Sequence, residues 1–156
     1  MNSIKYLIHY TWKENYESIM KDGYLKFIPE NCAHYCEGIY TQAVFDNMPF
    51  MGYLAPYPIY INKSILHNRK DYIIRTRHGN VTKKYPKEKW GFYGGEIVYD
   101  RSKYKNAKSA ERKLQKVLND LTMTNEVIFT KSISIKKYMI KNPEPFIEYE
   151  FKKIKV

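Results

Sequence analysis

A chain of 156 residues, 44% of them hydrophobic and 28% charged, has the size and composition of one globular domain, and we expect a single domain over residues 1–156. Lysine and arginine outnumber aspartate and glutamate by 27 to 16, and the net charge of +11 favours anionic partners such as nucleic acid or a dinucleotide. No apolar run reaches the roughly 18 residues of a membrane span, no signal-peptide pattern is found, and two cysteines make no disulfide framework, so we expect a cytoplasmic protein without membrane contact.

The N-terminal segment predicts a strand followed by a short helix. β-branched and aromatic residues in IKYLIHY, residues 4–10, favour a strand. Thr11 and Glu14 have the spacing of a capping box, which predicts a helix capped by Thr11, and the apolar residues that follow recur at helical spacing. Gly23 suits the left-handed residue that ends such a helix.

The rest of the chain contains mostly strands and one further helix. Strands are expected at residues 37–45, 57–62, 71–77, 96–100, 125–135 and 145–151, and an amphipathic helix is expected over about 102–121. Residues 81–95 are expected to form an irregular loop. Because crossover helices do not separate most of the strands, the pattern predicts an α+β fold with largely antiparallel sheets and two main helices.

Three short motifs stand out along this pattern. The first is His9-Tyr10-Thr11, before the first helix, and the second is Gly38-Ile39-Tyr40, at the start of a strand. The third is Asn125-Glu126-Val127-Ile128-Phe129, and it is followed by the segment Lys137–Ile140, which has an apolar end. Each has an ordinary structural explanation by itself: a core histidine, a half-buried strand tyrosine and a solvated glutamate. In combination and in this order they resemble the ADP-ribosyltransferase superfamily, and most closely its His-Tyr-Glu branch, which includes diphtheria toxin and the poly-ADP-ribose polymerases.

The resemblance implies a split sheet and an activity that transfers ADP-ribose from NAD⁺ to a macromolecular acceptor, without a metal. It assigns catalysis to Glu126, His9 and Tyr40: the glutamate stabilises an oxocarbenium-like state and bonds the ribose, the histidine contacts a ribose, and the tyrosine packs on nicotinamide. Phe50 or Tyr53 supplies a second stacking face. The implied NAD⁺-binding residues are His9, Tyr10, Thr11, Tyr40, Phe50 and Tyr53.

Two positions depart from the pattern of the superfamily. Tyr10 stands where the polymerases have a glycine that contacts nicotinamide. Thr124 stands where the arginine-modifying toxins have a second carboxylate, which argues against arginine as the acceptor. A protein side chain, a nucleic-acid base and a terminal phosphate all stay open as acceptors.

Other segments of the sequence suggest a metal site and alternative functions. Cys32, His34 and Cys36 are three metal-ligand types in five residues, but their spacing matches no zinc motif and a fourth ligand is missing. Lysines flank aromatic residues in KKYPKEKWGFYGG, residues 83–95, as in segments that bind single-stranded nucleic acid. The alternative function is therefore a basic module that binds nucleic acid or protein without catalysis, and a third is a member of the superfamily that has lost NAD⁺ binding.

Overall fold

The structure of the protein is a computed structural model, which describes residues 4–29, 37–45, 55–67, 69–77, 96–119 and 125–141. These residues form two α-helices and nine strands, joined in places by short 3₁₀ turns. In chain order the elements are β1 (Ile4–Thr11), α1 (Lys13–Asp22), β2 (Tyr24–Leu25), β3 (Ile39–Phe45), β4 (Tyr57–Asn62), η1 (Lys63–Leu66), β5 (Tyr72–Arg77), β6 (Glu96–Asp100), η3 (Arg101–Lys103), α4 (Ala107–Asn119), β7 (Asn125–Phe129), β8 (Ile133–Ser134) and β9 (Met139–Ile140).

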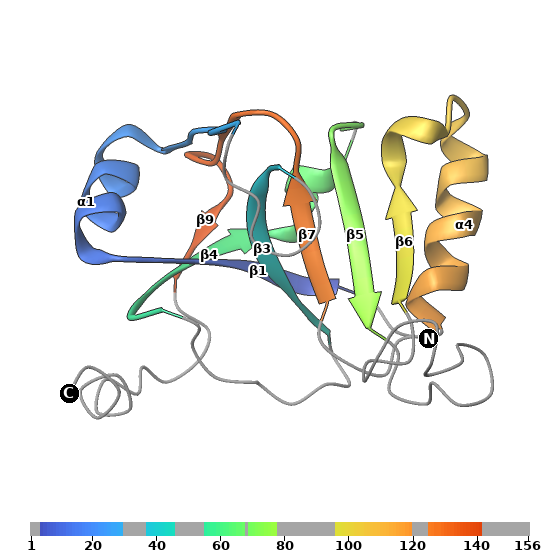
Figure 1. The fold of residues 1–156 in the computed structure, drawn as a ribbon, viewed down its shortest axis with the longest axis horizontal. Coiled ribbons are helices and arrows are strands. Elements are labelled where there is room, and N and C mark those ends of the chain that lie inside the picture. Colours follow the sequence, from blue (N-terminus) through green and yellow to red (C-terminus); the bar gives the residue numbers. More distant parts are fainter. Residues whose placement is uncertain are drawn as a thin grey trace.

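Seven of the strands form one sheet in the order β6-β5-β7-β3-β1-β4-β9, and β2 pairs with β8 in a second, two-stranded sheet. Every pairing among the described strands is antiparallel. The predicted α+β class with two main helices and antiparallel sheets is therefore confirmed. The large sheet is strongly twisted, so that β1 and β4 run across the direction of β7, β5 and β6 (Figure 1).

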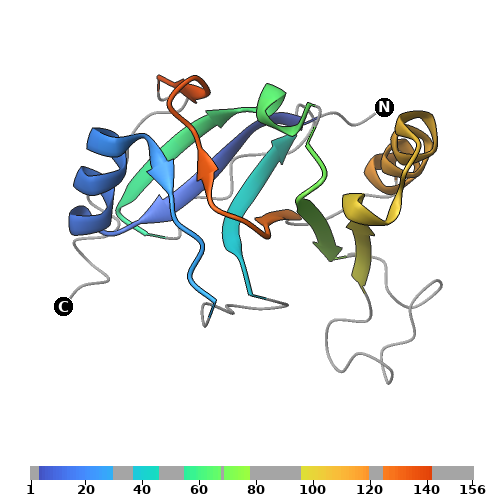
Figure 2. The same cartoon turned by 90° about the horizontal axis from the view of Figure 1, so that it is seen from above.

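The main core lies on the face of the sheet that the two helices cover. α1 packs near one end of this face and α4 near the other (Figure 2). The alternate strand residues Leu7, Ile61 and Val127 are completely buried in this core, and Tyr16 of α1 and Leu114 of α4 pack against it. A smaller cluster on the opposite face contains Tyr6, Ile8, Val44 and Tyr60. Apolar residues thus occupy both faces of the central strands.

The first helix ends as predicted but begins differently. Gly23 has φ 66°, and its N–H donates to the carbonyl of Ile19 over 2.6 Å, which is the left-handed C-cap that the sequence predicts. The predicted cap by Thr11 is wrong. Thr11 is the last residue of β1, where it is buried and pairs with Tyr57, so its side chain is not at the helix terminus. Trp12 is the N-cap residue, and its side chain makes no capping hydrogen bond.

The second helix begins later than predicted, at Ala107 instead of about residue 102, because side-chain hydrogen bonds form separate turns before it. The carboxylate of Asp100 accepts the N–H of Ser102 over 3.0 Å and holds a 3₁₀ turn, and Asn106 accepts the N–H of Lys108 over 2.8 Å at the start of α4. The strand expected at 145–151 and the loop expected at 81–95 lie outside the described residues. Within the described part of the chain, no helix has the length and apolar character that a bilayer crossing requires.

Candidate functional site

The strands that carry His9, Tyr40 and Glu126 are neighbours in the sheet, in the order β1, β3, β7. β1 pairs with β3 from Ile4–Phe45 as far as Ile8–Gln42. Beyond that point β1 continues along β4 to the pair Thr11–Tyr57, while β3 continues along β7 to the pair Ile39–Phe129. The described strands β1 and β3 therefore separate after Ile8, and His9 is the first residue of β1 past this fork.

The imidazole of His9 connects the two strands where their backbone pairing ends. Its Nδ1 lies 2.9 Å from the carbonyl oxygen of Tyr40. A carbonyl can only accept a hydrogen bond, so Nδ1 carries the proton and Nε2 of the neutral ring is an acceptor. Burial lowers the pKa of His9, and the bond to the Tyr40 carbonyl opposes this shift in part. The neutral ring can therefore accept a hydrogen bond from a ligand hydroxyl at Nε2.

Tyr40 and Glu126 lie on the same face of the sheet. Tyr40 pairs directly with Ile128, and Glu126 is two residues earlier on β7, so the two side chains are diagonal neighbours. His9 pairs with Ile59 of the main core and belongs to the opposite face. The structure thus brings Tyr40 and Glu126 together on one face, and it joins His9 to them through the backbone of Tyr40.

Glu126 is held by an arginine from the strand on its other side. The two residues pair directly between β5 and β7, and Nη1 of Arg75 donates to Oε2 of Glu126 over 3.2 Å. The Arg75 side chain is 11% exposed and that of Glu126 is 25% exposed, so the carboxylate keeps some access to solvent. The pair orients an ionised carboxylate at the surface of the sheet.

A cavity of about 340 Å³ lies next to the fork, between the end of β1, α1 and β2. We call it the β1–α1 cavity; among the residues that line it are His9, Thr11, Trp12, Asn15, Tyr24 and Ile39. Trp12 and Tyr24, which are 56% and 42% exposed, and the exposed Ile28 also border it. Large apolar side chains left exposed beside a concave site are typical of ligand binding. Neither Tyr40 nor Glu126 is among the described residues that line this cavity.

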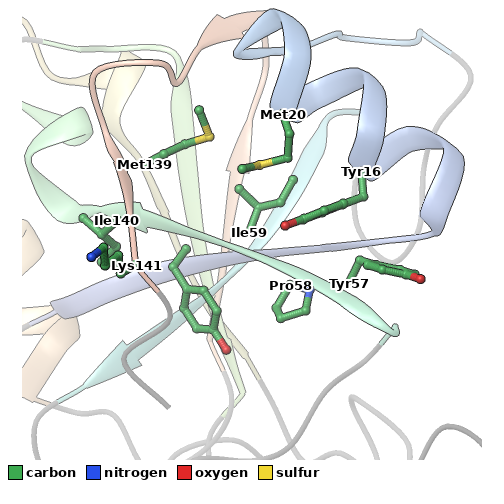
Figure 3. A pocket seen from close by; sticks show the side chains of 9 residues that line it. Tyr16, Met20, Tyr57, Pro58, Ile59, Met139, Ile140 and Lys141 are labelled. Carbon is green, nitrogen blue, oxygen red and sulfur yellow. The ribbon is translucent and has the colours of Figure 1, made fainter. Parts of the chain in front are cut away.

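A larger, mostly apolar groove of about 570 Å³ lies under the other side of α1. Figure 3 shows Tyr16 and Met20 of α1 pointing toward Ile59 of β4, with Met139 of β9 opposite. Its described lining contains no histidine or carboxylate, and its ionisable groups are Lys141 and the phenols of Tyr16, Tyr57 and Tyr60. The β1–α1 cavity contains His9 of the first motif, and we take it as the candidate ligand site.

Several predicted residues lie where the structure gives no description. Phe50 and Tyr53, the predicted second stacking face, fall in residues 46–54, and the Cys32, His34 and Cys36 group falls in residues 30–36; both are outside the described residues. Across the described ranges, no group of three or more histidine, cysteine, aspartate or glutamate side chains has an arrangement suited to a metal ion.

Gly38 of the Gly-Ile-Tyr motif has a structural role of its own. A Cβ atom at this position would lie 2.5 Å from Cγ2 of Ile128 and 2.9 Å from the carbonyl oxygen of Phe129. Only glycine lets the start of β3 approach β7 this closely, and the buried Thr41 hydroxyl then donates to the carbonyl of Val127 over 2.8 Å. The motif glycine therefore sets the spacing between the Tyr40 and Glu126 strands.

Sequence reasoning missed two polar residues beside Glu126. Arg75 pairs with it from β5, and Gln42 pairs with it from β3. Strand alternation from Tyr40 is enough to put Gln42 on the same face as Tyr40. The position of Arg75 depends on β5 lying next to β7, which no sequence pattern reveals.

Comparisons with family models, curated proteins and solved structures find no match to the chain.

Proposed function

We propose that the protein transfers ADP-ribose from NAD⁺ to a macromolecular acceptor, a protein or a nucleic acid, and that its fold is of the ADP-ribosyltransferase type. The observation that carries the proposal is the adjacency of the three strands with the motif residues. Tyr40 and Glu126 are diagonal neighbours on one face, and His9 binds the backbone of Tyr40 at the fork. Residues separated by 31 and 86 positions in the sequence thus converge on one region of the sheet.

The β1–α1 cavity supports binding of the adenosine half of NAD⁺. Its exposed Trp12 and Tyr24 offer flat apolar surfaces for a purine, and Nε2 of His9 can accept a hydrogen bond from a ribose hydroxyl. The cavity lies on the face of His9, and Tyr40 and Glu126 lie on the opposite face. The proposal therefore requires the dinucleotide to pass from one face to the other at the fork between β1 and β3.

The chemistry needs few groups because NAD⁺ already contains its leaving group. The bond between the anomeric carbon and the pyridinium nitrogen breaks, nicotinamide departs with the electron pair, and an acceptor atom bonds to that carbon and loses its proton. Positive charge develops on the sugar as the bond breaks, as in glycoside hydrolysis. The carboxylate of Glu126, oriented by Arg75, is suited to stabilise that charge, and Tyr40 offers a ring beside it for nicotinamide.

The direct test is a calorimetric titration of the full chain with NAD⁺, followed by a turnover assay with NAD⁺ labelled in the nicotinamide ring. We expect saturable binding, release of labelled nicotinamide, and an affinity that falls about tenfold in Trp12→Ala through loss of the stacking surface. Met20→Ala is the matched control, because Met20 is an exposed apolar residue of the same helix outside the β1–α1 cavity. If the chain neither binds NAD⁺ nor releases nicotinamide, the proposed function is wrong.

One helix supports a second candidate function, the binding of nucleic acid without catalysis. Lys108, Arg112 and Lys116 recur every four residues on α4 and are exposed, opposite Ala110 and Leu114, which face the core. Three cations in line on one helix face match the charge of a phosphate backbone. This surface also serves the first function if the acceptor is a nucleic acid.

A further inference from the structure

Gln42 lies on β3, between the strands that carry His9 and Glu126, although no motif points to it. It pairs with Ile8 of β1 on one side and with Glu126 of β7 on the other. Directly paired residues of neighbouring strands project from the same face, so Gln42 shares the face of Glu126. Tyr40, two residues earlier on β3, shares that face as well.

The amide oxygen of Gln42 is the feature that requires an explanation. Its Oε1 atom is shielded from solvent and has no hydrogen-bond partner within the described part of the chain. Buried polar atoms are almost always hydrogen-bonded, because a buried acceptor without a donor has lost its water and gained nothing in return. An apolar side chain of similar length would avoid this penalty, so the amide at this position indicates a donor that is supplied from outside the described residues.

The polar neighbours of Gln42 do not supply this donor. The ionised carboxylate of Glu126 is an acceptor only. The nearest cation in the same row is Arg75, and it lies on the far side of β7, two strand spacings or about 10 Å from β3. Its Nη1 is directed to Glu126 Oε2. The row formed by Arg75, Glu126 and Gln42 thus has its donor at one end and an unsatisfied acceptor at the other.

We infer that Gln42 is a substrate-binding residue whose Oε1 accepts a hydrogen bond from the nicotinamide half of NAD⁺. This inference rests on the proposed function. Beside Tyr40 and Glu126, that half of the dinucleotide presents two kinds of donor: the N–H groups of the carboxamide and the hydroxyls of the ribose. Either one satisfies the oxygen, and NAD⁺ binding then gains a hydrogen bond that the free protein lacks.

The test replaces Gln42 with methionine, which keeps the length of the side chain and removes the acceptor. Because the change also removes an unsatisfied buried atom, we expect the urea midpoint of Gln42→Met to equal or exceed that of the unmodified chain, while its Kd for NAD⁺ rises about tenfold. A residue with a purely structural role would shift both quantities in the destabilising direction. Gln42→Leu is a second variant with the same expectation, and Gln115→Met on α4 is the control for the chemical change.

A dinucleotide analogue separates the two donors. In 3-acetylpyridine adenine dinucleotide a methyl ketone replaces the carboxamide, so the amide N–H groups are absent. If the carboxamide is the donor, the unmodified chain binds this analogue about tenfold more weakly than NAD⁺, and Gln42→Met binds the two equally. If a ribose hydroxyl is the donor, the unmodified chain binds both alike and the variant weakens both.

Two results overturn the inference, and they differ from each other. If the Gln42→Met and Gln42→Leu variants fold and bind NAD⁺ as tightly as the unmodified chain, only the role of Gln42 is overturned. An unmodified chain that does not bind NAD⁺ would overturn the proposed function and this inference together.

Discussion

Glu126 is the residue on which the proposed transfer depends most directly. Glu126→Gln keeps the shape of the side chain and an oxygen for the bond from Arg75, but it removes the negative charge. We expect the rate of nicotinamide release to fall about a hundredfold to a thousandfold, the usual loss when one electrostatic stabiliser of a transition state is removed. The measurement is single-turnover release from labelled NAD⁺, with circular dichroism to check the fold.

The control for this prediction is Glu17→Gln, which removes one exposed carboxylate from α1. It should leave the rate unchanged. Release at the normal rate by a folded Glu126→Gln variant would exclude Glu126 from the mechanism.

His9 makes the stability of the fold dependent on pH. Burial lowers the pKa of His9 below the 6.5 of an unfolded chain, so below pH 6.5 the unfolded state takes up a proton that the folded state does not. The free energy of unfolding therefore decreases as the pH falls through this region, by at most about 1.4 kcal/mol per pH unit from this residue. Urea unfolding between pH 7.5 and pH 5 should show a flatter pH dependence for His9→Gln than for the unmodified chain.

His67→Gln is the companion to that experiment, because His67 is exposed beyond η1. Its pH dependence should match that of the unmodified chain. If His9→Gln loses stability on acidification as steeply as the unmodified chain, His9 is not the source of the effect.

Individual elements of the fold could be predicted where the local pattern and the tertiary contacts agree. β1, β4 and β5 follow their apolar and β-branched runs, and Gly23 ends α1 in the predicted conformation. Thr11 marks where local reasoning fails. Its capping-box spacing is a local signal, but the pairing of β1 with β4 extends the strand through Thr11 and buries its side chain.

The end of α1 gives a test at the scale of an element. Gly23 has φ 66°, and an added Cβ would lie 2.8 Å from Cβ of Lys136 and 3.3 Å from its Cα. Gly23→Ala should lower the free energy of unfolding by about 1–3 kcal/mol, because both the left-handed conformation and the contact oppose a side chain. Equilibrium unfolding in urea measures the change.

Gly23→Asn separates the two causes. It meets the same contact with Lys136, but asparagine tolerates the left-handed region better than alanine does. The asparagine variant should therefore be the more stable of the two. Equal losses would mean that the contact, and not the backbone conformation, requires glycine.

At the scale of the molecule, the candidate site depends on strand order, which the sequence does not reveal. The motif residues His9, Tyr40 and Glu126 could be selected in advance, but their adjacency requires β3 to lie between β1 and β7. Periodicity describes one strand at a time, whereas pairing is decided by packing over the whole sheet. For this reason Arg75 and Gln42, which share the row of Glu126, became visible only in the folded chain.

The net charge of +11 leads to the last prediction, which concerns nucleic acid. The lysines at 83, 84, 87 and 89, which the sequence favours as phosphate contacts, lie outside the described residues, so the test uses the exposed α4 row of Lys108, Arg112 and Lys116. Each phosphate contact releases counterions, and on single strands it adds about 0.7 to the slope of log K against log salt. Anisotropy titrations of labelled single-stranded DNA and RNA should therefore show binding that weakens with salt, and the triple glutamine variant should reduce the slope by about 2.

A second triple variant shows whether position or total charge is responsible. Lys13, Lys21 and Lys26 are exposed around α1, and their replacement by glutamine removes the same three charges at the opposite end of the sheet from α4 (Figure 2). If α4 is the binding surface, this control keeps nearly the full slope, because charges that make no phosphate contact release no counterions. Equal losses in the two variants would mean that net charge alone attracts the strand. No binding even at low salt would direct the search for the acceptor toward proteins.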